Sequence, residues 1–170
     1  MSLFATSIDS PVGPLTLVAS DIGLVAVLWQ DDDPLRVRLG PSETRDDHPI
    51  LREATRQLRG YFAGEVTAFD LPLDLRGTDF QKRVWAALLA IPYGETRSYG
   101  AIAHAIGRPE ASRAVGAANG RNPLSIVAPC HRVVGAKGHL TGFAGGLDAK
   151  ATLLALERRS GSARDGELPF

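Results

Sequence analysis

The only cysteine of this chain, Cys130, is followed directly by a histidine and an arginine. A lone thiol cannot form a disulfide within the chain, so it either packs in the core or acts as a nucleophile. Unpaired cysteines are commonly buried, but a thiol with a pKa of about 8.5 becomes nucleophilic only beside a base or a cation. His131 and Arg132 are neighbours of these two types, and they favour a nucleophilic Cys130.

The position of His131 sets a condition on the backbone. Adjacent side chains of an extended strand point to opposite faces, so His131 can serve Cys130 only from irregular backbone or through a water. Pro129 and Pro123 are residues that hold such a backbone. An imidazole that acts as a base also needs a group to orient it, and Glu157 is one acidic candidate.

Composition narrows the class of protein. The 170 residues are 44% hydrophobic and 22% charged, as in a globular protein of one or two domains. No apolar run approaches the roughly 18 residues that span a bilayer, and we expect a cytoplasmic protein without membrane contact. One cysteine and four scattered histidines give neither a disulfide framework nor metal-ligand spacing, so we expect no metal and no cofactor.

Charge divides the chain into two unlike halves. Residues 1–76 hold 7 arginines, no lysine and 12 acidic residues, for a net charge of −5, whereas residues 77–170 hold 12 basic and 7 acidic residues, for +5. Chance segregation of surface charge is one explanation. The other is a protein whose second half alone meets a polyanion, because phosphates need only local positive charge.

The elements of the first half form a small sheet and a helix. Three apolar runs between turns rich in Pro, Gly and Asp predict antiparallel strands at 3–8, 15–19 and 24–29. Residues 30–47 are polar, and we expect them to be partly mobile. Apolar spacing then predicts a helix from about Asp47 to Gly64, followed by an extended connector.

The second half is predicted to be helical. A capping-box pair, Thr78 and Gln81, precedes an apolar helical pattern that ends at Pro92. Two short helices, at about 99–106 and 110–119, are then separated by a turn with glycine, which is typical of a helix-turn-helix.

The rest of this half would complete a winged fold. Residues 133–141 predict a hairpin that would be the wing, and a helix over 147–159 closes the domain. Residues 160–170 are expected to be a disordered tail.

The predicted helix at 110–119 consists mostly of residues with small side chains. Its small residues leave Arg113 as the one long cationic side chain, so the helix can approach another backbone or a nucleic-acid groove closely. Tight packing inside the domain is the alternative explanation for the small residues.

Together these residues resemble the O6-alkylguanine-DNA alkyltransferases, the methylated-DNA-protein-cysteine methyltransferase family. The resemblance covers about residues 77–157. It rests on the ordered motifs Gly77-Thr78-Asp79-Phe80-Gln81, Val84-Trp85, Pro92-Tyr93-Gly94, Ser98-Tyr99, Arg113-Ala114-Val115-Gly116, Asn122-Pro123, Ile126, Pro129-Cys130-His131-Arg132-Val133, Gly145-Gly146 and Glu157. The family has an α+β (α/β) fold, which implies a ribonuclease H-like N-terminal domain at 1–76 and a winged helix-turn-helix domain at 77–159. The first half resembles the family only in its coarse strand pattern.

The resemblance implies a single-turnover reaction at Cys130. The thiol would attack the alkyl carbon of O6-alkylguanine in duplex DNA and keep the alkyl group as a thioether. His131 would take the thiol proton through water, with Glu157 orienting it. Tyr99 would protonate or hydrogen-bond the leaving guanine at N3. Asn122 would pin the turn before the thiol.

The resemblance also implies how DNA is bound. Arg113 would replace the flipped nucleotide in the base stack, and a slim helix suits the minor groove, about 6 Å wide. The implied DNA-binding residues are Tyr99, Arg113, Ala114, Gly116, Ala117 and Arg121. The implied substrate pocket consists of Ser125, Val133, Phe143 and Ala144. We expect a monomer in solution whose partner is double-stranded DNA; cooperative binding on DNA and repair of O4-alkylthymine stay open.

Two positions depart from some members of the family. Serine stands there in place of Ala144, so a side-chain hydroxyl near the substrate oxygen is absent here. Proline stands in place of Ser125, which bears on pocket width and on tolerance for bulky alkyl groups. The zinc-binding cysteines and the cysteine-rich regulatory domain of certain relatives have no counterpart, so we expect no phosphotriester-driven transcriptional control.

Three other functions compete with alkyl transfer. A non-catalytic protein that binds alkylated DNA and flags the damage would not need Cys130. A cysteine hydrolase built from Cys130, His131 and Glu157 would turn over repeatedly. A sequence-specific winged-helix regulator would need side chains that read bases, and the helix at 110–119 offers almost none.

Overall fold

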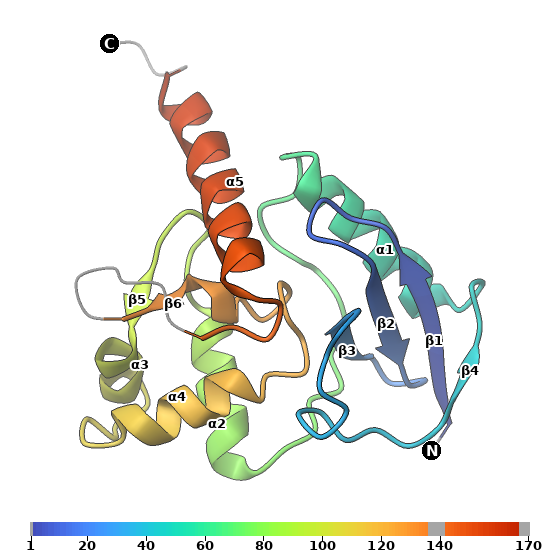
Figure 1. Cartoon of the computed structure of the whole chain (residues 1–170), viewed down its shortest axis with the longest axis horizontal. Coiled ribbons are helices and arrows are strands. Elements are labelled where there is room, and N and C mark those ends of the chain that lie inside the picture. Colours follow the sequence, from blue (N-terminus) through green and yellow to red (C-terminus); the bar gives the residue numbers. More distant parts are fainter. Residues whose placement is uncertain (1, 136–141, 167–170) are drawn as a thin grey trace.

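A computed structural model describes residues 2–135 and 142–166, with the side chains described as far as residue 159 (Figure 1). The strands are β1 (Leu3–Ile8), β2 (Leu15–Ala19), β3 (Leu24–Trp29), β4 (Ser42–Thr44), β5 (Arg97–Ser98) and β6 (Val133–Val134). The helices are α1 (Pro49–Phe62), α2 (Asp79–Leu89), α3 (Tyr99–Ala105), α4 (Ser112–Gly120), α5 (Leu147–Gly166) and the short 3-10 helix η1 (Cys130–Arg132).

The N-terminal half is a four-stranded sheet in the order β3-β2-β1-β4, with α1 alongside it (Figure 1). The three predicted strands are confirmed, and they pair antiparallel. A fourth strand, β4, lies in the polar segment expected to be partly mobile, and it pairs parallel with β1. Its Ser-Glu-Thr sequence is fully exposed, so no apolar alternation marks it. The backbone edge of β1 supplies the pairing instead.

Helix α1 starts and packs as its sequence predicts. The His48 side chain accepts a hydrogen bond at the N-terminus, and proline follows in the first turn. Leu51, Ala54 and Leu58 are fully buried and belong to the same core as β2 and β3. This face fixes the direction in which Tyr61, one turn further on, points.

The C-terminal half consists mainly of helices, and α3 and α4 are its helix-turn-helix pair. The capping box of α2 is present, because Thr78 and Gln81 each bond the other's backbone N–H. Helix α4 begins at Ser112 rather than near Glu110, since the preceding turn closes with a bond from the Ala111 N–H to the Arg108 carbonyl. The prediction of an α+β fold with a sheet-plus-helix half and a helical half is confirmed.

The predicted wing lies largely outside the described residues, since the structure describes nothing between 135 and 142. Its first residues form β6, which pairs parallel with β5. Helix α5 extends through 160–166, where the sequence predicted a disordered tail, and 167–170 lie outside the described residues. None of the described helices is long and apolar enough to cross a membrane.

Strand β3 joins the two halves through its outer edge. The Leu24 N–H donates to the Pro72 carbonyl of the connector, and the Val27 N–H donates to the Pro123 carbonyl in the second half, each at 2.8 Å. Residues of the 124–128 loop are buried in the same core as the sheet. The free edge of the sheet is therefore covered, and the loop ahead of Cys130 is attached to it.

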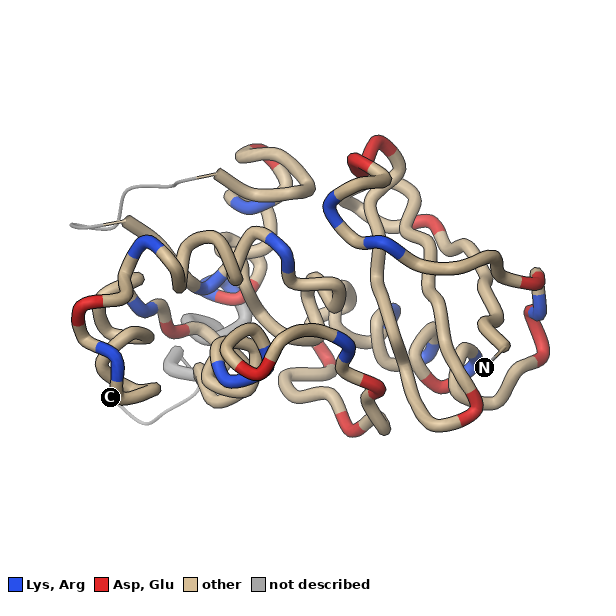
Figure 2. Tube along the Cα trace, turned by 90° about the horizontal axis from the view of Figure 1, so that it is seen from below, with Lys and Arg blue, Asp and Glu red and all other residues tan. Residues whose placement is uncertain are grey.

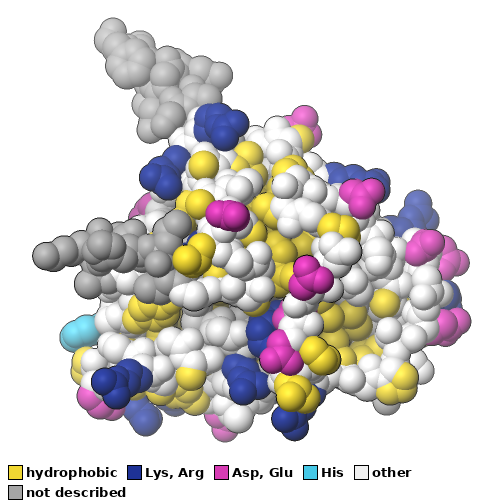
Figure 3. All heavy atoms as spheres, viewed as in Figure 1, with side chains coloured by type: hydrophobic (Ala, Val, Ile, Leu, Met, Phe, Trp, Pro, Cys, Tyr) yellow, Lys and Arg dark blue, Asp and Glu magenta, His cyan; other side chains and the backbone are white. Residues whose placement is uncertain are grey.

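Charge follows the division seen in the sequence. Lys and Arg predominate along the helical half, and Asp and Glu are more frequent along the sheet half (Figure 2). In the space-filling view, basic side chains lie over the lower edge of the helical half, where α4 and α2 are placed in Figure 1 (Figure 3).

Candidate active site

The loop from Asn122 to Cys130 is held from inside by an amide side chain. Asn122 is fully buried; its Nδ2 donates to the Ala128 carbonyl at 2.7 Å, and its Oδ1 accepts from the Leu124 N–H at 3.0 Å. These two bonds close the turn between α4 and the thiol. The resemblance implied that Asn122 holds this turn, and these are the two bonds through which its side chain contacts the loop.

Two tight turns bend the same loop. Ile126 has a φ of +75°, and the flanking Val127 N–H bonds the Ser125 carbonyl, as in a γ-turn with left-handed φ. Pro129 has φ −78° and ψ 68°, with the Cys130 N–H bonded to the Ala128 carbonyl, as in an inverse γ-turn. A β-branched residue with positive φ costs about 1–3 kcal/mol and persists only where its surroundings fix it.

Cys130 begins η1 and is buried. Only 4% of its surface is exposed, and it belongs to the core of the helical half. Burial raises the pKa of the thiol, while the polar Asn122 and Ser125 side chains and the charges of Arg36 and Lys150 oppose that rise. The thiol is therefore protonated at neutral pH, and its reaction requires a base.

Glu157 is the centre of a buried polar cluster. Its Oε2 lies 2.6 Å from Tyr61 Oη, 2.7 Å from His131 Nε2 and 3.0 Å from Arg132 Nη2, and its Oε1 accepts from Arg132 Nε at 2.8 Å. Burial alone would raise the pKa of Glu157, but the bonds from His131 and Arg132 outweigh it and lower the pKa to about 2. The group is thus a carboxylate.

That carboxylate fixes the tautomer of His131. An ionised carboxylate only accepts, so His131 Nε2 carries the proton that it donates to Glu157. The other ring nitrogen, Nδ1, is buried and has no hydrogen-bond partner among the described residues. Burial lowers the pKa of His131. The histidine is therefore a neutral base whose lone pair is on Nδ1.

Three further residues belong to this site, and the sequence reasoning did not assign them these roles. Tyr61 comes from α1 of the first half. Lys150 is fully buried, and its Nζ donates to the Val133 carbonyl at 2.7 Å. Arg36 is paired with Asp32 and donates to the Asn122 carbonyl at 2.8 Å. A lysine at a buried position of an apolar helical pattern was the one available signal.

Helix α4 exposes two of its small residues, Ala114 and Ala117, and buries Ala118. Its exposed residues include Arg113, Ala114 and Ala117, and Arg121 follows at the C-terminal end. Gly116 is half-buried, and a Cβ added to it would lie 3.8 Å from the ring of Tyr99. The predicted DNA-binding residues therefore lie on one side of the molecule, with Tyr99 beside the helix.

Two of the predicted pocket residues, Ser125 and Phe143, contact a residue that was not predicted, Trp29. Its Nε1 donates to Ser125 Oγ at 3.0 Å, and its ring meets Phe143 edge-on at 5.3 Å between centroids. A Cβ added to Gly145 would lie 2.7 Å from the indole ring. Val133 is fully buried beside Cys130 in the helical core, and Ala144 is half-buried.

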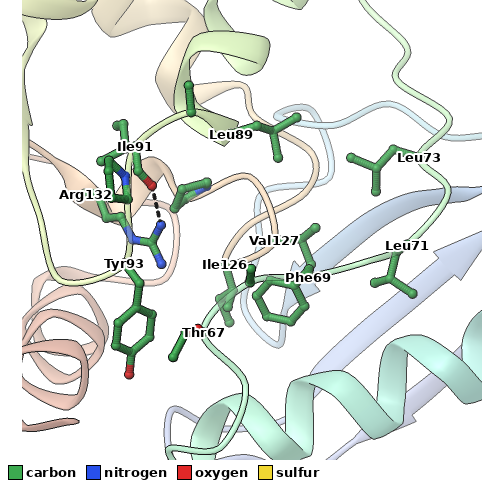
Figure 4. A pocket seen from close by; sticks show the side chains of 14 residues that line it. Thr67, Phe69, Leu71, Leu73, Leu89, Ile91, Tyr93, Ile126, Val127 and Arg132 are labelled. Atoms are coloured by element: carbon green, nitrogen blue, oxygen red, sulfur yellow. Dashed lines mark hydrogen bonds between the residues drawn. The ribbon is translucent and has the colours of Figure 1, made fainter. Parts of the chain in front are cut away.

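A different pocket lies on the connector side of the thiol loop (Figure 4). Phe69 and Leu71 line it from the connector and Ile126 from the loop, and its lining does not include Cys130. Arg132 enters it from η1 and donates to the Ile91 carbonyl at 2.7 Å, the bond drawn in Figure 4. Arg132 therefore ties the thiol loop to Ile91. Because Cys130 does not line this pocket, an alkyl group bound there would not reach the sulfur.

Fold and site together define a helix-turn-helix protein with a buried cysteine followed by a histidine that a carboxylate holds. Residues 79–159 match the family described as 6-O-methylguanine DNA methyltransferase, DNA binding domain, and residues 3–75 match the ribonuclease-like domain of the same family.

Individual relatives agree with this match. A methylated-DNA-protein-cysteine methyltransferase of Mycolicibacterium paratuberculosis is 56% identical over 157 residues, covering 92% of this chain and 93% of that protein. One of Methanosarcina acetivorans is 52% identical over 149 residues, covering 88% and 94%. The Mycobacterium tuberculosis protein OGT, solved in complex with DNA, superposes with a TM-score of 0.84 at 51% identity, covering 94% of each chain.

The chain belongs to the methylated-DNA-protein-cysteine methyltransferase family, and it is a DNA-repair methyltransferase whose acceptor is a protein cysteine.

Proposed function

We propose that Cys130 accepts the alkyl group of O6-alkylguanine from double-stranded DNA. One observation carries this assignment: the family transfers the group to a protein cysteine, and this chain has a single cysteine. The His131 and Glu157 side chains beside it supply the base and its orienting group. Repair of O4-alkylthymine would use the same acceptor and is part of the proposal.

The proposed step is an in-line displacement at the alkyl carbon. A bond forms between Cys130 Sγ and that carbon while the carbon–O6 bond breaks, and guanine leaves with the bonding electron pair. The thiol proton goes through water to His131 Nδ1, and the Tyr99 hydroxyl hydrogen-bonds or protonates guanine N3. The thioether has no route back to a thiol, so each molecule reacts once.

The electrostatics of the cluster support His131 as the proton acceptor. Its Nε2–H is already donated to Glu157, so an incoming proton can go only to Nδ1. The cation that forms is then stabilised by the adjacent carboxylate, which stays ionised because its pKa is about 2. Asn122 acts on geometry, through the two bonds that shape the thiol loop.

We propose that α4 enters the minor groove of DNA. The small exposed side chains Ala114 and Ala117 allow close approach, and Arg113 projects from the same helix into the stack in place of the flipped nucleotide. Because a buried sulfur is reached only by a group inserted into the protein, extrusion of the base is required.

Three further expectations belong to this proposal. The chain divides near Arg76 into two domains, which the separate family matches at 3–75 and 79–159 support. The protein acts as a monomer in solution, and cooperative binding on DNA is an open part of the proposal. Cys130 must stay reduced to accept carbon, for which the cytoplasm is the suitable compartment.

Stoichiometry tests the proposal. Limiting protein is mixed with duplex DNA carrying O6-methylguanine, and the lesion is counted in the DNA by chromatography. We expect the loss of lesion to stop at one per protein molecule, and Cys130→Ser to remove none. Repeated turnover would identify a hydrolase, and tight binding with every lesion intact would identify a damage flag.

A further inference from the structure

Tyr61 and His131 bond the same oxygen of Glu157. The Tyr61 hydroxyl oxygen lies 2.6 Å from Glu157 Oε2, and His131 Nε2 lies 2.7 Å from that same atom. All three side chains are buried, so bulk water does not compete for the shared oxygen. An ionised carboxylate only accepts, so both groups donate to it. A side chain of α1, in the first half, thus donates to the group that orients the proposed base.

Glu157 is held in place independently of this bond, because Arg132 donates to both of its oxygens. Arg132 Nε donates to Oε1 at 2.8 Å, and Nη2 donates to Oε2 at 3.0 Å. The guanidinium is held in turn by the Ile91 carbonyl at 2.7 Å, the bond drawn in Figure 4, and its Cζ lies 5.6 Å from the centre of the Tyr93 ring. The Tyr61 hydroxyl therefore acts on the charge of Glu157 more than on its position.

The hydroxyl and the imidazole compete for one negative charge. Burial, and next the charge of Glu157, raise the pKa of Tyr61, so the hydroxyl keeps its proton and remains a donor. Its bond is strongest while the carboxylate charge is not shared, and it weakens once His131 becomes a cation beside that carboxylate. A bond that is stronger in one protonation state favours that state, so Tyr61 favours neutral His131.

We propose that Tyr61 is a positioning residue that keeps the proposed base unprotonated: its hydroxyl bonds the oxygen that also holds His131 Nε2–H, and it limits how strongly Glu157 stabilises an imidazolium. A base that already carries a proton on Nδ1 cannot accept one from Cys130. The first half of the chain thereby sets the lowest pH at which transfer runs. This inference rests on the proposal that His131 takes the thiol proton.

The test compares two changes of opposite sign at one position. Tyr61→Phe removes the donor, whereas Tyr61→3-fluorotyrosine, introduced at that position alone, keeps the ring and makes the phenol a stronger donor. The matched control is Trp85→Phe, which removes a buried N–H that donates to the Ala118 carbonyl at 2.9 Å in the core of the helical half. Circular dichroism verifies that each protein is folded.

The readout is the pH at which the His131 imidazole titrates, followed by NMR of protein labelled with ¹⁵N-histidine, and it does not depend on transfer. The chain has four histidines, and His131→Gln identifies the signal. The other titratable groups nearby stay the same in all these variants: Arg132 and Cys130 in η1, Lys150 in α5, and Tyr93.

The two Tyr61 variants should move this midpoint in opposite directions. We expect it to rise in Tyr61→Phe, to fall in Tyr61→3-fluorotyrosine and to match the wild type in Trp85→Phe. An unchanged midpoint in both Tyr61 variants, or a shift of the same sign in both, would overturn the proposal. The fluorinated protein decides alone if Tyr61→Phe does not fold.

Transfer kinetics separate this inference from the proposed function. In Tyr61→Phe we expect the deficit in single-turnover rate, relative to the wild type, to grow several-fold from alkaline to mildly acidic pH, because more of the base is then protonated. A deficit that is equal at every pH would mean that Tyr61 only supports the fold, and it would contradict the proposal. Absence of transfer in the wild type would refute the proposed function and leave the titration result standing.

Discussion

The hydroxyl oxygen of Tyr61 lies 2.6 Å from Oε2 of Glu157, so a helix of the N-terminal half donates to the carboxylate that holds His131. Both side chains are buried, and they are far apart in the sequence. The first half of the chain therefore contributes a side chain to the buried polar cluster around Glu157, through Tyr61 in α1.

Removing that donor tests the connection. Tyr61→Phe deletes one oxygen and leaves Glu157 with its bonds from His131 and Arg132. Because hydrogen bonds to charged groups contribute more than neutral ones, we expect the free energy of unfolding to fall by about 2 kcal/mol, as measured by urea denaturation. An unchanged stability together with an unchanged transfer rate would show that the bond contributes nothing.

Glu157 gives the protein a defined acid sensitivity. On folding its pKa falls from 4.5 to about 2, so its stabilisation is fully present above about pH 4.5 and is lost as the pH drops toward 2. Denaturation at a series of pH values should show this loss in the wild type.

Glu157→Gln should remove that part of the pH dependence. It should also destabilise the protein by about 3–5 kcal/mol at neutral pH, because buried Arg132 loses its counter-charge. Parallel pH curves for the two proteins would contradict the assignment of the cluster.

His131 should determine how the transfer rate depends on pH. Burial lowers its pKa below 6.5, so the imidazole stays neutral and able to accept a proton when the pH falls through 6.5. We expect the wild-type rate to hold there. His131→Gln should be slower by about 10²-fold at neutral pH and should recover as the pH rises toward the raised pKa of the thiol. Single-turnover kinetics at several pH values measure both profiles.

Burial should also protect Cys130 from small reagents. Because only 4% of its surface is exposed, we expect iodoacetamide to label the folded protein on the order of 100-fold more slowly than the urea-unfolded chain. Equal labelling rates would mean that the sulfur is open to solvent, and extrusion of the base would then be unnecessary.

Much of this fold follows from patterns that the sequence displays. The strands at 3–8, 15–19 and 24–29 alternate or run apolar between strong turns, and the capping box of Thr78 and Gln81 marks the start of α2. Strand β4 could not be predicted, because its three residues are exposed and only pairing with β1 makes them a strand.

The sequence named His131 and Glu157 as candidate partners, but it gave no role to Tyr61, Lys150, Arg36 or Trp29. His131 Nε2 and Glu157 Oε2 lie 2.7 Å apart, and His131 directly follows Cys130 in the chain. The sequence patterns predict only that Tyr61 and Trp29 are buried in their own helix and strand. The spacing of apolar residues, every 3.6 residues in a helix or every 2 in a strand, indicates which side chains are buried but not which residues they contact. Their partners come from the packing of the two halves.

Arg113 should matter for DNA and not for folding. It is exposed on α4, so Arg113→Ala should change stability by less than about 0.5 kcal/mol. Affinity for duplex DNA carrying the lesion should fall on the order of tenfold, because the extruded base leaves a gap in the stack. Arg158→Ala, on exposed α5, is the control for loss of one positive charge. Equal losses in both variants, measured by fluorescence anisotropy, would reduce the role of Arg113 to general electrostatics.

Mass spectrometry of the peptide that contains Cys130, after reaction with duplex DNA carrying isotopically labelled O6-methylguanine, tests the central claim most directly. The account predicts one labelled methyl group on the sulfur of Cys130 in every reacted molecule, and unmodified guanine in the DNA. A labelled methyl group on any other residue, or full loss of the lesion with Cys130 unmodified, would contradict it.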